Sequence, residues 1–183
     1  MTYASFLFYV ALSFKNYYYL KTEVARHMEN ITQEKMIEIL KKVHFFSGFT
    51  DEELKLISGF MQWIKFEAGD IIIKEGMIEK TFFLIIKGKV SIKKKTWMGS
   101  LKKAIDMISA GQIFGEMAFI TGKPRTADII AEEETYVLKF SAEEMLKDET
   151  KYAHILVKFY KKFAEALSER LAKADRELVN LSM

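Results

Sequence analysis

The chain has 183 residues, half of them hydrophobic, which favours a single domain with helical extensions and a sizeable core. It contains no cysteine, which excludes a disulfide framework and a thiolate metal site, and we expect a cytoplasmic location. The formal net charge of +3 is too small to indicate nucleic-acid binding. All nine glycines lie between Gly48 and Gly122, so we expect strands in the middle and helices toward both ends.

Residues 1–22 form an aromatic-rich N-terminal segment that begins MTYASFLFYVALSF. A helix over residues 1–14 would be about 21 Å long, short of the ~30 Å hydrocarbon core of a bilayer. No basic stretch precedes it, as would be typical of a secretory signal. We expect the segment to pack on this protein or on a partner. Membrane contact through residues 1–20, with Lys15 and Lys21 beside Tyr17–Tyr19, is the alternative.

Residues 23–60 are predicted to form N-terminal helices. Apolar residues at helical spacing in Glu23–Val43 indicate an amphipathic helix, either continuous or in two pieces joined near residues 30–32. The sequence TDEE at residues 50–53 has the pattern of a capping box, which predicts a helix over Asp51–Phe60.

Residues 61–141 carry short strand patterns separated by glycine turns. Continuous apolar runs at Ile71–Ile73 and Phe82–Ile86 predict strands buried on both faces, and Val90 and Ile92 alternate with polar neighbours. Three further strands and one hairpin tip are predicted: Lys103–Ile108, Thr126–Ala131, Thr135–Phe140, and the tip at Trp97–Ser100. The pattern predicts an α+β, mainly β fold, in which an antiparallel, jelly-roll-like β-roll is flanked by N-terminal and C-terminal helices.

Lysines are concentrated around the predicted hairpin, at Lys87, Lys89, Lys93, Lys94, Lys95, Lys102 and Lys103. They are interleaved with Val90, Ile92 and Trp97. We expect a solvated strand face here, and contact with an acidic partner or with lipid headgroups is the alternative.

The stretch at residues 111–128, GQIFGEMAFITGKPRTAD, contains three glycines and the only proline of the chain. Gly115 precedes a short stretch that can form about one turn of helix. The loop at residues 122–124 then brings Arg125 back toward the start of that helix. The free N–H groups at the start of such a turn attract an anion, glycine permits close approach, and Arg125 adds a charged fork that suits phosphate. The carboxylate of Glu116 suits a ligand that also presents hydroxyl groups, as a ribose does. The stretch therefore predicts a nucleotide site.

No catalytic residue and no metal site is predicted. Gly122 and Lys123 do not complete a P-loop, because the spacing from Gly115 is wrong and Pro124 stands where serine or threonine is required. The three histidines have no ligand spacing between them, and no Ser/His/Asp set stands out.

Residues 142–183 are predicted to be helical, with Ser141 as the N-cap. Apolar residues recur at helical spacing, and the last of them have the spacing of a coiled-coil seam: Leu167, Leu171, Ala174, Leu178 and Leu181. We expect this stripe to pack on the roll. A homodimer formed through the C-terminal helix is the alternative.

The motif GEMAFITGKPRTA at Gly115–Ala127 resembles the phosphate-binding cassette of cyclic nucleotide-binding domains. Flanking stretches at His44–Ile57, Phe66–Gly76 and Phe82–Ile92 agree with that family, and the apolar turn at residues 77–80 departs from it. The resemblance implies a β-roll of eight strands and a last helix that moves over the bound base.

The resemblance also implies roles for individual residues. Glu116 would bind the ribose 2′-hydroxyl, and Arg125 would bind the cyclic phosphate. Backbone groups or a hydroxyl would come from the remaining cassette residues, Gly115, Met117, Ala118, Thr126 and Ala127.

The sequence thus predicts a non-enzymatic sensor that binds cAMP in preference to cGMP and repositions its C-terminal helices to signal to a protein partner. cGMP is the alternative ligand, because some relatives use a threonine at the position of Thr126 to reach the guanine amino group. The alternatives are a regulatory piece of a cyclic-nucleotide-gated channel or kinase, or a scaffold of the same fold that binds no nucleotide. A transcription factor would need a DNA-reading motif after Met183.

Overall fold

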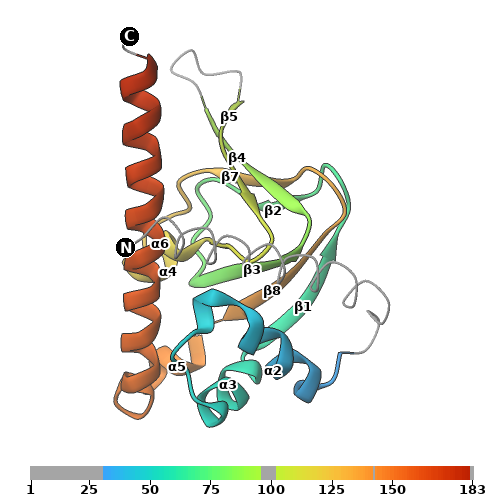
Figure 1. The fold of residues 1–183 in the computed structure, drawn as a ribbon, viewed down its shortest axis with the longest axis vertical. Coiled ribbons are helices and arrows are strands. Elements are labelled where there is room, and N and C mark those ends of the chain that lie inside the picture. Colours follow the sequence, from blue (N-terminus) through green and yellow to red (C-terminus); the bar gives the residue numbers. More distant parts are fainter. Residues whose placement is uncertain (1–30, 96–101, 142, 182–183) are drawn as a thin grey trace, which may run out of the picture. The chain divides into compact units, whose positions relative to one another are not determined.

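A computed structural model describes residues 31–95, 102–141 and 143–181 and divides the chain into two compact units, Met1–Ala142 and Glu143–Met183. The first unit contains two antiparallel four-stranded sheets, with strand orders β1-β8-β3-β6 and β2-β7-β4-β5 (Figure 1). The strands are β1 (Met61–Phe66), β2 (Ile71–Ile73), β3 (Thr81–Lys87), β4 (Lys89–Lys95), β5 (Lys102–Ser109), β6 (Ile113–Phe114), β7 (Asp128–Ala131) and β8 (Thr135–Ser141). The predicted mainly β roll with flanking helices is confirmed.

The helices before the roll begin at side-chain caps. Thr32 caps α2 (Gln33–Lys42), and the short 3₁₀ helix η2 (His44–Phe46) follows. The predicted capping box of α3 (Asp51–Ser58) is present, because the Thr50 hydroxyl accepts from the Glu53 N–H and the Glu53 carboxylate accepts from the Thr50 N–H. The described residues confirm the predicted helices, and α3 ends two residues earlier than expected.

Strand β3 is buried on both faces, as predicted for Phe82–Ile86. Successive side chains of a strand point to opposite faces, so Phe83 and Ile85 join the core between the two sheets. Phe82 lies on the other face, where its ring is 5.8 Å from that of Phe45 in η2 and 5.6 Å from that of Phe119. Helical aromatic residues therefore cover the outer face of this sheet.

The prediction that Ile71–Ile73 is buried on both faces is wrong. Ile73 is 4% exposed and packs in the core, but Ile71 is 49% exposed. Strand β2 is an edge strand of its sheet, and its register with β7 shifts between Ile71 and Ile73, so these two side chains are not buried alike.

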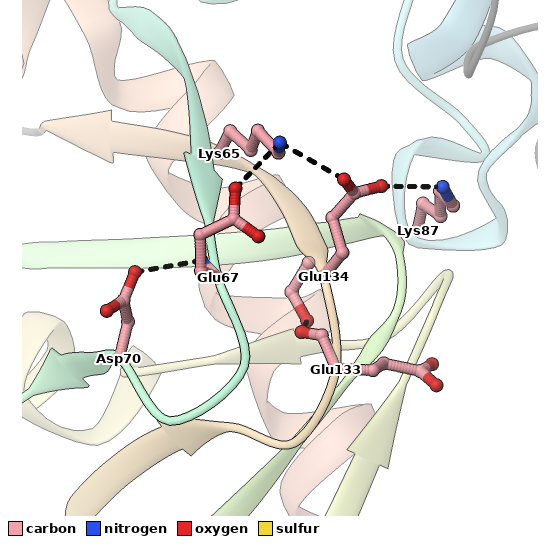
Figure 2. A network of polar contacts seen from close by, with 7 residues as sticks. Lys65, Glu67, Asp70, Lys87, Glu133 and Glu134 are labelled. Atoms are coloured by element: carbon pink, nitrogen blue, oxygen red, sulfur yellow. Dashed lines mark hydrogen bonds and ion pairs between the residues drawn. The ribbon is translucent and has the colours of Figure 1, made fainter.

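An ionic network joins the end of β1 to the turn before β8 (Figure 2). The Glu134 carboxylate lies 3.1 Å from the Lys65 ammonium and 2.9 Å from that of Lys87. Lys65 also lies 2.7 Å from Glu67, whose N–H donates to Asp70. Hydrogen bonds from Lys87 and then from Lys65 lower the pKa of Glu134 to about 2, so Glu134 is anionic and ties β1 to the end of β3.

The second unit consists of α5 (Glu143–Lys147) and α6 (Glu149–Leu181), which confirms the predicted C-terminal helices over the described residues. Within the predicted seam of α6, Leu171 and Leu178 are 63% and 65% exposed. The aromatic N-terminal segment and the predicted hairpin tip at Trp97–Ser100 lie outside the described residues.

Candidate functional site

The predicted helical turn after Gly115 is present as α4 (Glu116–Thr121). It follows β6 directly, and Gly115 has φ = +84°, a left-handed conformation that side chains disfavour. A Cβ atom at this position would also lie 2.8 Å from the Arg125 Nη1 and 3.2 Å from the Thr81 carbonyl oxygen. Both backbone conformation and close approach therefore require glycine. Gly122, with φ = +64°, ends the helix.

Arg125 lies next to Gly115 at the start of α4, and it is 5% exposed. Its Nη1 donates to the Gly115 carbonyl over 2.7 Å, and its Nη2 donates to the Thr81 hydroxyl over 2.6 Å. The backbone is held as well, since the Arg125 N–H donates to the Met77 carbonyl and the Gly76 N–H donates to the Arg125 carbonyl. The guanidinium is thus placed against the cassette glycine, as the sequence predicts.

Two acids act on this cation. The Arg125 Nη2 lies 3.6 Å from one oxygen of Glu79, whose other oxygen lies 2.6 Å from the Lys139 ammonium. Burial lowers the pKa of Arg125, and attraction first to Glu79 and then to Glu116 opposes that shift. Arginine keeps its charge in proteins, so the site holds a buried cation.

Glu79 is itself anionic. Burial alone would raise its pKa, but the Lys139 hydrogen bond, the charge of Lys139 and the charge of Arg125 together lower it. The site therefore contains an alternating set of charges that runs from Lys139 through Glu79 to Arg125.

The predicted site residues differ in their exposure. Glu116 is 1% exposed in the first turn of α4, and Ala118 and Ala127 are also buried. Met117 is 48% exposed, and Thr126 is exposed as well. The structure thus brings Gly115, Glu116 and Arg125 together, and the contributions of the other cassette residues stay predictions.

Sequence reasoning missed three residues that position the arginine: Thr81 in β3, Glu79 in the loop before it, and Lys139 in β8. They lie 44, 46 and 14 residues from Arg125 along the chain, so no local spacing links them to it. The unusual turn at residues 77–80 was the only signal, and it indicated an altered loop shape rather than a carboxylate facing the arginine.

This arrangement can hold an anion next to a hydroxyl group. The first N–H groups of α4 and the guanidinium suit the anion, and a buried carboxylate suits the hydroxyl. Within residues 31–95, 102–141 and 143–181, no cluster of acids and histidines could hold a metal ion. None of the helices in these same ranges combines the length and the apolar character needed to cross a bilayer.

Comparison with known proteins gives a consistent result. Residues 63–147 match the family model of the cyclic nucleotide-binding domain. The chain is 35% identical over 102 residues to the cGMP-dependent protein kinase, isozyme 2 forms cD5/T2, of Drosophila melanogaster, an alignment that covers 56% of this chain and 11% of the kinase. It is 28% identical over 146 residues to the Cyclic AMP receptor protein of Thermus thermophilus, covering 78% of this chain and 64% of that protein.

The fold is also found among solved structures. A cyclic nucleotide-binding domain from Methylobacillus flagellatus superposes with a TM-score of 0.69 at 24% identity, over 82% of this chain and 84% of that one. The chain spans a small part of the kinase relatives and somewhat less than two thirds of the receptor protein. The matches therefore concern a domain and not the whole of those proteins.

Proposed function

Because residues 63–147 match the family model of the cyclic nucleotide-binding domain, we propose that this chain is a non-catalytic regulatory module that binds a cyclic nucleotide. The observation that carries the proposal is the buried Arg125, anchored to the Gly115 carbonyl and lying beside the first turn of α4. A buried, permanently charged guanidinium next to the backbone N–H groups at the start of α4 suits a phosphate diester. The module acts in the cytoplasm.

Each half of the ligand has a proposed partner. Arg125 and the backbone N–H groups of the cassette bind the cyclic phosphate. Glu116 accepts a hydrogen bond from the ribose 2′-hydroxyl, which explains a buried carboxylate in a site for an anion. The same pair of groups would not favour a ligand that is only an anion, since Glu116 repels it.

cAMP is the first proposed ligand, supported by the similarity over 78% of this chain to the Cyclic AMP receptor protein, and cGMP is the second. Two observations favour cGMP: the exposed Thr126 next to Arg125, and the similarity to cGMP-dependent protein kinases. A hydroxyl at Thr126 is able to contact a guanine amino group as well as a phosphate.

Signalling is proposed to pass through α5 and α6. A ligand favours one placement of these helices only to the extent that it binds that placement more tightly. The exposed seam leucines Leu171 and Leu178 have the spacing of a coiled coil, so we propose that a second copy of this chain docks there. A downstream protein partner would respond to the new placement of α5 and α6.

Titration of the intact chain with cAMP, cGMP and 5′-AMP tests the binding. A ligand at about 100 times its dissociation constant stabilises the folded state by about 2.7 kcal/mol. At roughly 2–4 °C per kcal/mol, this raises Tm by about 5–11 °C. No shift with cAMP or cGMP would refute the proposal and favour a non-binding scaffold. An equal shift with 5′-AMP would indicate a general anion site.

Helix repositioning has its own test. The chain has no cysteine, so a spin-label pair can be introduced by Lys55→Cys in α3 and Lys161→Cys in α6, both exposed positions. We expect the distance distribution between the labels to shift when a binding nucleotide is added. An unchanged distribution in the presence of saturating ligand would contradict the repositioning and leave the binding intact.

A further inference from the structure

The β4–β5 pair extends beyond the sheet to which it belongs. Strand β7 pairs with β4 only from Val90 to Lys93, whereas the pairing of β4 with β5 continues to Lys95 opposite Lys102. Past Lys93 the two strands therefore run on as a two-stranded ribbon (Figure 1).

This end of the pair, which we call the basic ribbon, consists of Lys93–Lys95 and Lys102–Lys103. The register places Lys94 opposite Lys103 and Lys95 opposite Lys102. Like charges directly opposite each other destabilise a sheet. Successive residues of a strand point to opposite faces, so Lys93 and Lys94 lie on opposite faces of the ribbon.

The charge of two of these lysines is available to a partner. Lys94 and Lys103 are exposed and form no ion pair with any residue in the described part of the chain, while Lys93 lies 3.3 Å from Glu132. The five lysines of the basic ribbon exceed the net charge of +3 of the whole chain. The rest of the molecule is therefore net acidic, and the positive charge is concentrated in one place.

Protection of a sheet edge does not account for this arrangement. A single charged side chain is enough to discourage edge-to-edge pairing, whereas lysines placed opposite lysines add repulsion within the fold. An apolar residue lies among them as well. Ile105, at a register shift of β5, is 56% exposed and opposes no residue of β4.

We propose that the basic ribbon, together with Ile105, is a docking surface for an anionic lipid membrane. A lipid surface supplies spread negative charge for the exposed lysines Lys94 and Lys103 and an apolar layer for Ile105. A nucleic acid supplies the charge but no apolar layer. Bidentate phosphate recognition also favours arginine, and all five basic residues of the ribbon are lysines.

The test is co-sedimentation of the intact chain with phosphatidylcholine vesicles, with and without phosphatidylserine. Lys94→Ala combined with Lys103→Ala should lower partitioning onto the anionic vesicles roughly 30-fold, the factor that corresponds to about 1 kcal/mol per lysine. The matched control, Lys55→Ala with Lys161→Ala, removes the same charge from two other exposed positions and should bind like wild type. Raising the salt to ~1 M should release wild type from the vesicles.

The ribbon variant should melt no lower than wild type, because it removes a pair of opposed like charges. Its cyclic-nucleotide affinity should also be unchanged, so this test is independent of the proposed function. Equal partitioning of wild type onto neutral and anionic vesicles, or equal loss in the ribbon and control variants, would overturn the proposal. So would binding to a nucleic-acid duplex without binding to the anionic vesicles.

Discussion

Gly115→Ala should weaken nucleotide binding by more than its effect on folding would suggest. Gly115 has φ = +84°, and a left-handed conformation costs a residue with a Cβ about 1–2 kcal/mol. The new Cβ would also lie 2.8 Å from the Arg125 Nη1, closer than real Cβ contacts. The Ile73 side chain and the Thr81 carbonyl oxygen each lie 3.2 Å away, and the guanidinium, as the nearest group and the end of a flexible side chain, is the one expected to shift.

Moving the guanidinium breaks its hydrogen bond to the Gly115 carbonyl and misplaces it for a phosphate. Hydrogen bonds to charged groups contribute about 1.5–3 kcal/mol, so affinity for the binding nucleotide should fall about 10- to 150-fold. Isothermal titration calorimetry measures this loss directly, and thermal melting measures the loss of stability.

Gly111→Ala is the matched control. Gly111 has φ = +85°, nearly the same as Gly115, but a Cβ there would meet nothing within 4 Å. Both variants should lose about 1–2 kcal/mol of folding free energy from the strained backbone, seen as roughly 2–8 °C in Tm, and Gly115→Ala should lose more because its Cβ also displaces the Arg125 guanidinium. Only Gly115→Ala should lose affinity. Wild-type affinity in Gly115→Ala, or an equal loss in Gly111→Ala, would refute the role assigned to the close approach of glycine and arginine.

Three further outcomes are expected. Arg125→Ala should cost about 2–5 kcal/mol of binding, at least tenfold in affinity by titration, and unchanged affinity would remove the guanidinium from the phosphate site. Glu116→Gln should show a smaller preference for cAMP over 2′-deoxy-cAMP than wild type, because an amide oxygen accepts a weaker hydrogen bond than a carboxylate; an undiminished preference would contradict the ribose contact. The folded-state pKa of Glu134 is lowered to about 2 from 4.5, so its stabilising effect is complete above pH ~4.5 and is lost as the pH falls through about 2. The small Tm difference between wild type and Glu134→Gln should therefore shrink over that window, and a constant difference would exclude the ion pairs as its source.

Features set by neighbouring residues were predictable from the sequence. The capping box at Thr50 and Glu53 depends on a spacing of three residues, and the buried strand Phe82–Ile86 depends on a continuous apolar run. The approach of Gly115 to Arg125 was predictable because a short helix and one turn join them. In each case the chemistry that determines the structure lies within about ten residues of chain.

Features set by pairing between distant strands were not predictable. The exposure of Ile71 accompanies a register shift between Ile71 and Ile73 in the edge strand β2, which the apolar run does not reveal. The opposition of Lys94 and Lys103 depends on a register that includes a shift between Ile92 and Lys93. A change of one residue in register would move every side chain beyond it to the other face.

The residues that sequence reasoning missed around Arg125 determine how its guanidinium is held. The nearer contact of Glu79 is with Lys139 at 2.6 Å, and its contact with Arg125 is longer at 3.6 Å. Glu79 therefore partly neutralises the buried Arg125, while the shorter contact with Lys139 keeps the Glu79 carboxylate away from closer contact with the guanidinium. The hydrogen bonds to Gly115 and Thr81 fix the position of the guanidinium. A group that is already ordered loses little freedom when it binds a phosphate. Under the proposed function the cassette is thus preformed, and a ligand signal has to come from the difference in its affinity for alternative placements of α5 and α6 rather than from assembly of the phosphate site.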